Sequence, residues 1–348
     1  MYKALATSLS AEQAHQMAIF ALKYGHALIP PAPRHQNLEV DLGFGCPLPS
    51  PIGLAAGFDK DADALLGSQK LGFGALEIGS VTPQAQPGNP KPRVFRLSQD
   101  AGVINRYGFN SEGIEAIVKK LVRLNNQGLT VPLGINLGKN KTGDALDNYR
   151  VGLSRLAPHA DYITINLSSP NTPGLRDQQN LSAITTLIDA LAPVWPTKKV
   201  LVKLAPDLED HDLGDLVDYL ASSRVDGVIM GNTTLTRPAS LTSQHAQQNG
   251  GLSGIPLFDL ALEKLQVVVS ANRALPSSRR LLVVGCGGID SAARALKMIR
   301  CGADMVQLYT GMAVHGPGLV RKINADLSAI LQRENINNIR QLVGKDHH

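Results

Sequence analysis

The sequence predicts a (β/α)8 TIM barrel with a small helical extension at its N-terminal end. Eight short apolar segments recur from about residue 50 onward, and each has the β-branched character of a buried parallel strand. Segments of helical character fill several of the intervals, so the order is strand, helix, strand throughout. A doubly wound open sheet is the alternative fold, but it would ordinarily place a glycine-rich fingerprint after its first strand, and the sequence has none there.

The composition is that of a globular chain. Of its 348 residues, 43% are hydrophobic and 18% charged, and the net charge of +5 suits an anionic ligand or an anionic surface. No basic run alternates with aromatic residues, so we expect no nucleic-acid partner. Cys46, Cys286 and Cys301 lack any C-x-x-C spacing, which indicates reduced thiols in a cytosolic context, with neither a metal site nor a disulfide. No stretch approaches the ~18 consecutive apolar residues of a membrane span.

Residues 1–34 form the predicted extension, and residues 35–348 form the barrel domain. Ser10 and Gln13 have the spacing of a capping box. Apolar residues at helical spacing follow it: Ala14, Met17, Ala18, Ala21 and Leu22. We expect an amphipathic helix here, residues 2–9 can form another, and the prolines of 30–33 end the extension. Two alternatives stay open for this helix, namely packing on the barrel and lying on a membrane surface.

Taken in order, the eight predicted strands begin just after residue 50. They are residues 52–56, 75–78, 133–136, 162–167, 200–203, 227–230, 281–285 and 305–308. The predicted helices are residues 114–124, 181–191, 213–222, 258–271 and 292–300. The gaps 79–132 and 231–280 are too long for plain crossovers, so we expect insertions on the catalytic face there.

Polar side chains follow the first six predicted strands where each strand ends. In a barrel these ends meet on one face, so the set points into a cleft, whereas packing would call for apolar residues. An ordinary surface position is an equal alternative for Lys60, and a lone Ser-Pro-Asn is more often a plain helix-capping loop. The fourth strand end is denser, since it crowds five such side chains into seven positions: Asn166, Ser168, Ser169, Asn171 and Thr172.

The last two predicted strands end in glycine-rich loops instead, at residues 285–289 and 309–311. Backbone amides exposed by glycine before a helix are the phosphate site that many (β/α)8 barrels share. Because the sequence has no G-x-G-x-x-G, a cofactor with one phosphate fits better than a dinucleotide, and we favour flavin mononucleotide (FMN). Lys203 would then lie where it can stabilise the anionic edge of a reduced flavin.

Seven blocks together resemble dihydroorotate dehydrogenase in its class 2, quinone-dependent form. They are LAAGFDK at 54–60, EIGSVTP at 77–83, NRYGFN at 105–110, GINLGKN at 134–140, NLSSPNTPGLR at 166–176, GGLSG at 250–254 and QLYT at 307–310. The resemblance runs from about Leu9 to about Gly318. It implies an enzyme in which FMN in a (β/α)8 barrel oxidises (S)-dihydroorotate to orotate, in de novo pyrimidine synthesis, and passes the electrons to a quinone.

The resemblance also implies roles for single residues. Ser169 matches the catalytic base, and Thr172 and Phe109 match residues that shape a proton path from it. The substrate-binding set it implies is Lys60, Asn105, Arg106, Tyr107, Gly108, Phe109, Asn166, Asn171, Asn232 and Thr233. Amides suit the N–H and C=O groups of a cyclic ureide, and the ammonium suits its carboxylate.

The implied cofactor-binding set takes in most of the strand ends. It consists of Ala56, Gly57, Phe58, Asp59, Lys60, Ser80, Asn136, Asn166, Lys203, Gly231, Gly254, Gly288, Tyr309 and Thr310. Gly231 departs from the family, which usually has Ser or Thr there, so a side-chain contact to the flavin is lost or replaced by backbone.

Two observations assign the class: serine stands where soluble class 1 enzymes use cysteine, and the extension is present. In class 2 that extension forms a quinone tunnel, and His15, Arg96 and Tyr309 match residues lining it. The resemblance thus implies a ubiquinone or menaquinone partner and a monomer held peripherally on a membrane, the cytoplasmic face of the inner membrane in a bacterium. The alternatives are a soluble enzyme using fumarate or NAD, and a non-catalytic phosphate- or lipid-binding barrel.

Overall fold

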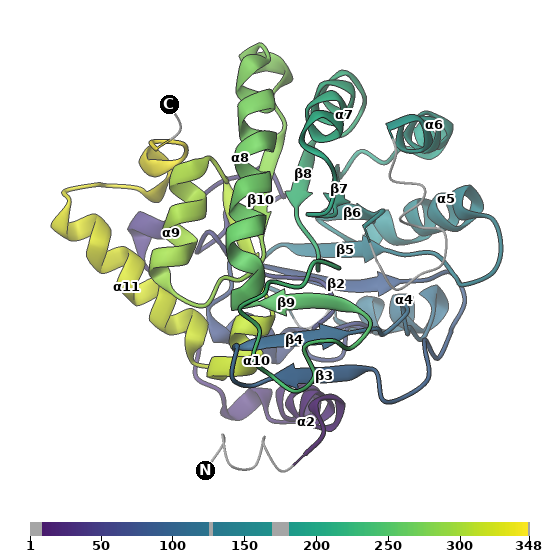
Figure 1. Ribbon diagram of the computed structural model, residues 1–348, viewed down its shortest axis with the longest axis horizontal. Coiled ribbons are helices and arrows are strands. Elements are labelled where there is room, and N and C mark those ends of the chain that lie inside the picture. The colour runs from purple at the N-terminus through teal and green to yellow at the C-terminus, as the bar shows by residue number, and fades with distance from the viewer. Residues whose placement is uncertain (1–8, 125–127, 169–180, 347–348) are drawn as a thin grey trace.

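A closed barrel of eight parallel strands forms the centre of the protein (Figure 1). The computed structural model describes residues 9–124, 128–168 and 181–346. Around the barrel the strands follow the order β1-β11-β10-β8-β7-β6-β5-β2. Their bounds are β1 Ile52–Leu54, β2 Ala75–Val81, β5 Leu133–Leu137, β6 Tyr162–Asn166, β7 Lys199–Leu204, β8 Gly227–Met230, β10 Leu282–Cys286 and β11 Met305–Leu308. Each predicted strand is present, with ends that differ by a few residues, so the predicted (β/α)8 barrel is confirmed.

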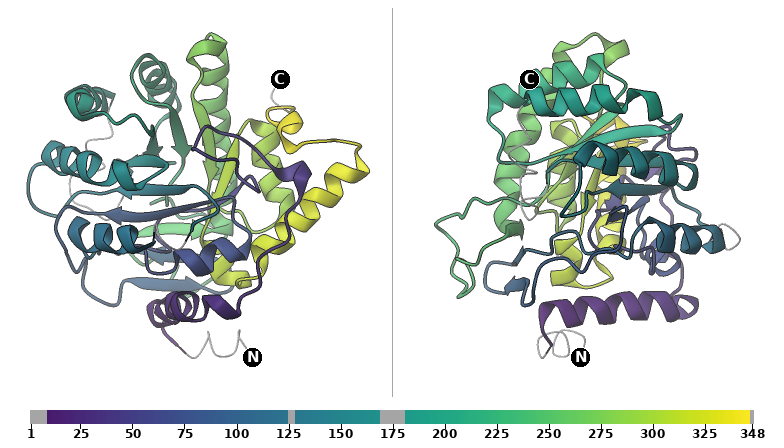
Figure 2. Two further views of the ribbon diagram at one scale, coloured as in Figure 1. Left: turned by 180° about the vertical axis from the view of Figure 1, so that it is seen from behind. Right: turned by 90° about the vertical axis from the view of Figure 1, so that its right-hand side faces the viewer.

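Helices cover the outside of the barrel (Figures 1 and 2). They are α3 Leu65–Ser68, α4 Ile114–Leu124, α5 Ala145–Leu156, α6 Leu181–Leu191, α7 Asp210–Ser222, α8 Phe258–Ala274, α9 Ala292–Cys301, α10 Thr310–His315 and α11 Leu319–Arg333. All five predicted helices are found. The pattern missed α5, although Asp144 caps it by accepting from the backbone N–H of Asp147, and it missed α11, which buries Leu319, Ile323, Leu327 and Leu331 at helical spacing.

The two long gaps carry insertions, as predicted, and the insertions pair with each other. β3 (Val94–Leu97) and β4 (Gly102–Asn105) come from the first insertion and β9 (Gly251–Gly254) from the second. They form an antiparallel sheet in the order β3-β4-β9, and its apolar side chains make a small core of their own. Figure 1 shows this sheet between the barrel and the N-terminal helix. β9 therefore completes a sheet whose other two strands come from the first insertion. Ser253 Oγ on β9 also donates a hydrogen bond to the carbonyl of Val103 on β4, 150 residues earlier in the sequence.

The N-terminal helix α2 (Ala11–Tyr24) lies across one side of the molecule (Figure 2). Its predicted capping box is present: Ser10 Oγ accepts from the N–H of Gln13 at 3.3 Å, and Gln13 Oε1 accepts from the N–H of Ser10 at 3.0 Å. The helix packs on the barrel domain, with Leu22 buried against it. Met17, one of the predicted apolar positions, is 47% exposed and does not take part in this packing.

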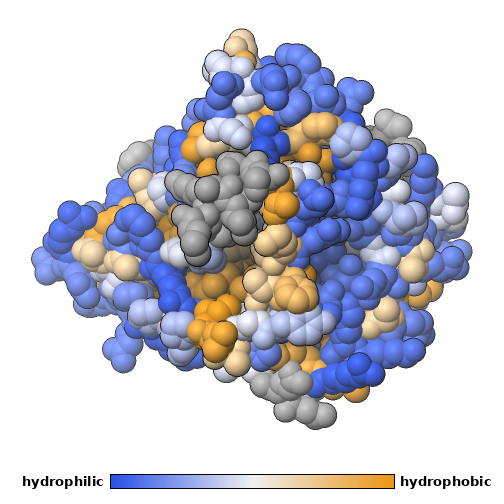
Figure 3. All heavy atoms as spheres, turned by 90° about the horizontal axis from the view of Figure 1, so that it is seen from below, coloured by the Kyte–Doolittle hydropathy of each residue, from blue (hydrophilic) through white to orange (hydrophobic). Residues whose placement is uncertain are grey.

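The opposite side of α2 presents large apolar side chains to solvent. Met17, Phe20 and Tyr24 are exposed on it, and Leu28 is exposed just beyond its end. Figure 3 views the face on which α2 lies and shows apolar residues gathered there. Within residues 9–124, 128–168 and 181–346, no helix combines the length and apolar character that crossing a membrane requires. Exposed apolar side chains gathered in this way make this side of α2 a candidate interaction surface.

One carboxylate is fully buried inside the barrel. Glu77 on β2 accepts hydrogen bonds from Asn136 Nδ2 at 2.8 Å, from Gln307 Nε2 at 2.8 Å and from the hydroxyl of Tyr162 at 3.2 Å. Three donors on three different strands therefore converge on one charge. A buried charge is tolerated when hydrogen bonds replace its lost hydration.

We expect Glu77→Ala to lower the free energy of unfolding by about 3 to 5 kcal/mol, since it leaves three buried donors unsatisfied. Urea unfolding followed by circular dichroism measures the change. Glu115→Ala on α4 is the control, because that carboxylate is exposed and pairs with Arg155 on the surface, so its loss costs below about 1 kcal/mol. Equal losses in the two variants would contradict the structural role of Glu77.

Candidate active site

A single continuous cavity of about 940 Å³ runs from α2 to the carboxyl ends of the barrel strands. Small apolar residues of α2 line one end, including Ala11, Ala14 and Ala18. Polar strand ends and the glycine-rich loops line the other. An apolar approach that leads to a polar chamber suits two ligands of different character.

The polar chamber has an ammonium and a connected set of amide and hydroxyl groups. Lys203, at the end of β7, is 4% exposed, and within the described ranges no carboxylate lies within ion-pair distance of it. Asn166 Nδ2 donates to Ser80 Oγ at 2.9 Å and to Asn136 Oδ1 at 3.0 Å, and Ser80 Oγ in turn donates to Asn136 Oδ1. An ammonium buried without a counter-charge points to an anionic or electron-rich ligand.

Two glycines border the same cavity at positions where side chains do not fit. Gly254 has φ +91°, and a Cβ there would meet the carbonyl oxygen of Ala101 at 2.5 Å. Gly288 has φ +69°, and a Cβ there would meet Phe258 at 2.5 Å. With Thr310 beside them, these loops offer backbone N–H groups and a hydroxyl, the donors that phosphate prefers. Together with Lys203 and the amides, this donor set fits a flavin carrying one phosphate.

Lys60 lies in the part of the cavity where the sequence predicts the substrate. Its ammonium donates to the carbonyl of Gly57 at 2.6 Å and lies 4.1 Å from the ring centre of Tyr107. Burial lowers the pKa of Lys60 to about 8, and the positive charge of Arg93 adds to this effect. Asn105 and Thr233 line the same region. Among the described residues the buried Lys60 ammonium has one hydrogen-bond acceptor, the carbonyl of Gly57, so it can also pair with an anionic ligand.

The fourth strand end is held in place by hydrogen bonds. The hydroxyl of Tyr149 donates to the carbonyl of Asn166 at 2.7 Å. Ser168 Oγ donates to Asn166 Oδ1 at 3.0 Å and accepts from Asn232 Nδ2 at 2.8 Å. These hydrogen bonds fix the end of β6 and Ser168 at the cavity. The predicted base, Ser169, is the next residue in the sequence. Ser169, Asn171 and Thr172 themselves lie outside the described residues.

Four predicted ligand residues do not line the cavity. The guanidinium of Arg106 instead donates to Gln248 Oε1 and to the carbonyls of Asn249 and Pro92. The carboxylate of Asp59 accepts the N–H groups of Asp63 and Ala64, both at 2.8 Å, and so fixes the loop that carries Lys60. Asn136 lies behind Ser80 and Asn166, and Gly231 is buried. These positions support the site from behind its surface.

The remaining predicted positions within the described ranges all border the cavity. They are Ala56, Gly57, Phe58, Lys60, Ser80, Asn105, Tyr107, Gly108, Phe109, Asn166, Lys203, Asn232, Thr233, Gly254, Gly288, Tyr309 and Thr310, with His15 and Arg96 at the apolar end. Positions predicted from the polar strand ends, from the glycine-rich loops and from the family resemblance therefore meet at one cavity. Their individual roles remain predictions.

His15 and Tyr309 meet at the junction of the two ends. Nδ1 of His15 lies 3.2 Å from the hydroxyl of Tyr309, and the ring of Phe58 packs edge-on against His15 with centroids 5.4 Å apart. Burial lowers the pKa of His15 to about 3, and the charge of Lys60 adds to this effect, so the imidazole is neutral at pH 7. Arg96 donates to the carbonyl of Leu9 at 2.7 Å. At pH 7 the contact between His15 and Tyr309 therefore joins two neutral side chains.

Several polar residues that border this cavity are absent from the predicted site, among them Gln307 and Cys286. Gln307 lies within β11, and among the described residues its buried Oε1 has no hydrogen-bond partner. Cys286 ends β10; burial raises the pKa of its thiol, and the positive charge of Lys203 opposes this effect. Gln307 could have been identified from the sequence, because it is a glutamine within an otherwise apolar predicted strand. Across the same described ranges, no group of three or more His, Cys, Asp or Glu side chains could hold a metal ion.

Comparison with known proteins gives concordant matches. The family model described as dihydroorotate dehydrogenase matches residues 38–331. The dihydroorotate dehydrogenase (quinone) of Azorhizobium caulinodans is 45% identical over 96% of this chain and 95% of its own length, and the mitochondrial protein of that name from Mus musculus is 42% identical over 99% and 89%. The solved structure of DHODH from Eimeria tenella in complex with ferulenol superposes with a TM-score of 0.88 at 35% identity, covering 97% of this chain and 96% of that one.

Proposed function

The chain belongs to the dihydroorotate dehydrogenase family, in its quinone-dependent class, and we propose that it oxidises (S)-dihydroorotate to orotate with bound FMN and reduces a membrane quinone. The observation that carries the proposal is the one continuous cavity. Its polar end has the ammonium and amides that a pyrimidine acid requires, and its apolar end opens along α2. A flavin bound between the two ends could accept electrons from dihydroorotate and pass them to a quinone, although the two molecules never contact each other.

The residues of the polar end divide the chemistry among them. When bound, FMN supplies the acceptor for the hydride that leaves C6 of the substrate. Ser169 takes the proton from C5, and Thr172 and Phe109 shape its path to solvent. The ammonium of Lys203 favours negative charge at the polar edge of the flavin site. Lys60 pairs with the substrate carboxylate, while Asn105, Asn171 and Asn232 meet the ureide N–H and C=O groups.

The absorption spectrum under anaerobic conditions tests this proposal. Purified protein should be yellow, dihydroorotate should bleach the flavin band, and a ubiquinone or menaquinone analogue should restore it. Rapid turnover with fumarate or NAD⁺ and none with quinones would instead support a soluble-type enzyme. A folded, colourless protein, or a flavin that dihydroorotate does not bleach, would overturn the enzymatic proposal in favour of a phosphate- or lipid-binding barrel.

We expect the affinity for orotate to fall as the pH rises above about 8. Burial lowers the pKa of Lys60 to about 8, so above this pH the free protein loses the ammonium that pairs with the carboxylate. Above this pH, orotate binding must be accompanied by protonation of Lys60. The Kd for orotate should therefore be flat between about pH 6.5 and 7.5, and above the pKa of Lys60 it should approach a tenfold rise per pH unit. Calorimetric titration with orotate measures it. Lys60→Arg, which stays protonated, should flatten the profile; a rise that persists in this variant would assign it to another group.

The apolar end of the cavity, lined by α2, is the proposed entrance for the quinone. The exposed side chains Met17, Phe20 and Leu28 would rest on the membrane that supplies it, with the basic residues nearby attracted to anionic lipid. For a bacterial cell we propose a monomer that is held peripherally on the cytoplasmic face of the inner membrane. Both statements extend the proposal and can be tested by flotation with anionic vesicles and by sedimentation.

We expect Ala18→Trp to raise the KM for a short-chain ubiquinone by about tenfold or more, because the indole would fill the apolar entrance. Reduction of the flavin by dihydroorotate should keep its rate, since the polar end is untouched. Stopped-flow measurement of the two half-reactions separates these effects. Gln16→Trp adds the same bulk on an exposed position of α2 and should change neither. Equal effects of the two variants would place the quinone entrance elsewhere.

A further inference from the structure

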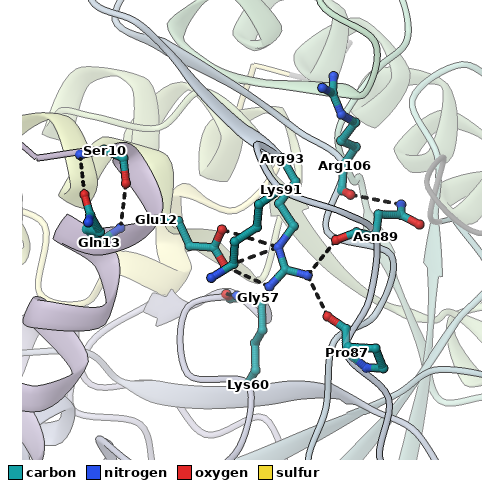
Figure 4. Close-up of polar contacts among 10 residues, drawn as sticks. All are labelled: Ser10, Glu12, Gln13, Gly57, Lys60, Pro87, Asn89, Lys91, Arg93 and Arg106. Carbon is teal, nitrogen blue, oxygen red and sulfur yellow. Dashed lines mark hydrogen bonds and ion pairs between the residues drawn. The ribbon is translucent and has the colours of Figure 1, made fainter.

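An ion pair with little exposure joins the N-terminal helix to the insertion beside the barrel mouth. Glu12 lies in the first turn of α2, and its carboxylate accepts from Arg93 Nη2 at 2.7 Å and from Arg93 Nε at 3.2 Å. The side chains are only 12% and 7% exposed, respectively. Burial raises the pKa of Glu12, but the hydrogen bonds and charge of Arg93, together with smaller contributions from Lys91, outweigh it, so the net pKa is lowered. Figure 4 shows the two side chains facing each other.

Arg93 uses its remaining N–H groups to hold the loop that precedes it. Nη1 donates to the carbonyl of Pro87 at 2.6 Å and to the carbonyl of Asn89 at 3.0 Å (Figure 4). This part of the chain, residues 87–93, forms no helix or strand of its own. Its conformation therefore depends on the guanidinium, and the guanidinium depends on Glu12 for its charge balance.

The same loop fixes the substrate segment, residues 105–109. The N–H of Asn89 donates to the carbonyl of Tyr107 at 2.8 Å, its Nδ2 donates to the carbonyl of Arg106 at 2.9 Å, and the N–H of Arg106 donates to the carbonyl of Arg93 at 2.9 Å. Packing is equally close, since a Cβ on Gly108 would come within 2.7 Å of the Asn89 side chain. Loop and segment therefore have little freedom to move independently.

The contacts end at the group that would bind the substrate carboxylate. The guanidinium carbon of Arg93 lies 5.2 Å from the ring centre of Tyr107, and the ammonium of Lys60 lies 4.1 Å from that centre. Displacing Arg93 would thus shift the ring on which Lys60 rests. A chain of direct contacts runs from the helix at the apolar end of the cavity to the polar end.

We propose that Glu12 is a positioning residue for the substrate: by holding Arg93 it keeps residues 87–93 and 105–109 in the arrangement that binds dihydroorotate and orotate. The inference rests on the proposed function and deepens it, because it links the two ends of the cavity. Docking of α2 strengthens substrate binding, and by thermodynamic reciprocity substrate binding strengthens the docking of α2. Lys91 lies 3.6 Å from the same carboxylate, but it is 61% exposed, so solvent screens its ion pair more than that of Arg93.

Glu12→Gln in the full-length, FMN-loaded protein tests the inference. The amide keeps the shape of the side chain but leaves Arg93 buried without a counter-charge. We expect the orotate Kd, measured by calorimetry, and the KM for dihydroorotate to rise about tenfold, within the usual range of coupling between sites. The kcat at saturating substrate should stay within about twofold, because Glu12 touches no reacting atom. Lys91→Ala is the matched control and should leave all three values unchanged.

Hydrogen exchange of the α2 amides provides a second readout that does not depend on turnover. Orotate should slow exchange across residues 11–24 in the wild type, and this protection should disappear in Glu12→Gln. If Glu12→Gln does not unfold cooperatively, the test uses Arg93→Lys instead. This substitution keeps the positive charge but loses the paired N–H groups of the guanidinium, so it should also weaken orotate binding and abolish the protection of α2. An unchanged orotate Kd together with undiminished protection of α2 would overturn the inference and leave the proposed function intact. A wild-type protein that does not bind orotate would overturn both.

Discussion

Replacing Ser169 with alanine is expected to lower the rate of flavin reduction by dihydroorotate about 10² to 10⁴-fold at pH 7, the usual contribution of a positioned general base. The hydride cannot leave C6 unless the proton on C5 has an acceptor, and alanine offers none. Orotate, the product, has already lost the C5 proton that the base removes, so its affinity should stay within a fewfold of the wild-type value. Anaerobic stopped-flow absorbance gives the rate, and calorimetry gives the affinity.

Two neighbouring substitutions separate a base from a packing residue. Ser169→Cys restores an ionisable group whose ordinary pKa of about 8.5 is far below that of a hydroxyl, so it should recover part of the rate. Ser168→Ala removes a hydroxyl one residue earlier that bonds Asn166 and Asn232, and it should change the KM for dihydroorotate more than kcat. If Ser168→Ala slows flavin reduction as much as Ser169→Ala, the base is not Ser169.

The barrel could be predicted because its periodic signals are local. Each strand is a short apolar run, and each polar strand end follows from the rule that parallel strands in a barrel end on one face. Short strands outside the barrel give weaker signals. β3 has alternating burial over only four residues, and β9 contains two glycines, so neither shows a strand pattern in the sequence. Their pairing depends on contacts between two separate insertions.

Partners that are distant in sequence could not be predicted at all. Glu12 and Arg93 are 81 residues apart, and nothing in the pattern around either residue names the other. Arg106 shows the same limit: nothing in the sequence indicates that its guanidinium donates to Gln248 and to the carbonyls of Asn249 and Pro92. The rule that parallel barrel strands end on one face locates a backbone position. The direction of a long side chain depends on which acceptors the folded chain brings near it.

We expect Lys203→Met to lower kcat about 10² to 10³-fold, comparable to removing one preorganised group that stabilises developing charge. The ammonium is almost fully buried at the end of β7, lines the cavity, and has no carboxylate partner among residues 9–124, 128–168 and 181–346. Its charge favours the electron-rich form of a flavin bound beside it. The two-electron reduction potential should therefore fall by about 30 mV for each 1.4 kcal/mol of lost interaction, which a xanthine oxidase titration against reference dyes measures.

The stability of the flavin-free protein should change in the opposite direction. A buried ammonium without a counter-charge costs folding free energy, so the uncharged methionine of similar length should leave the apoprotein as stable as the wild type or more stable. Lys199→Met, at the other end of β7, is the matched control, since its ammonium is partly exposed and lies 3.4 Å from Asp226. It should change neither the potential nor kcat. A lower apoprotein Tm for Lys203→Met with an unchanged potential would show that Lys203 supports the barrel rather than the cofactor site.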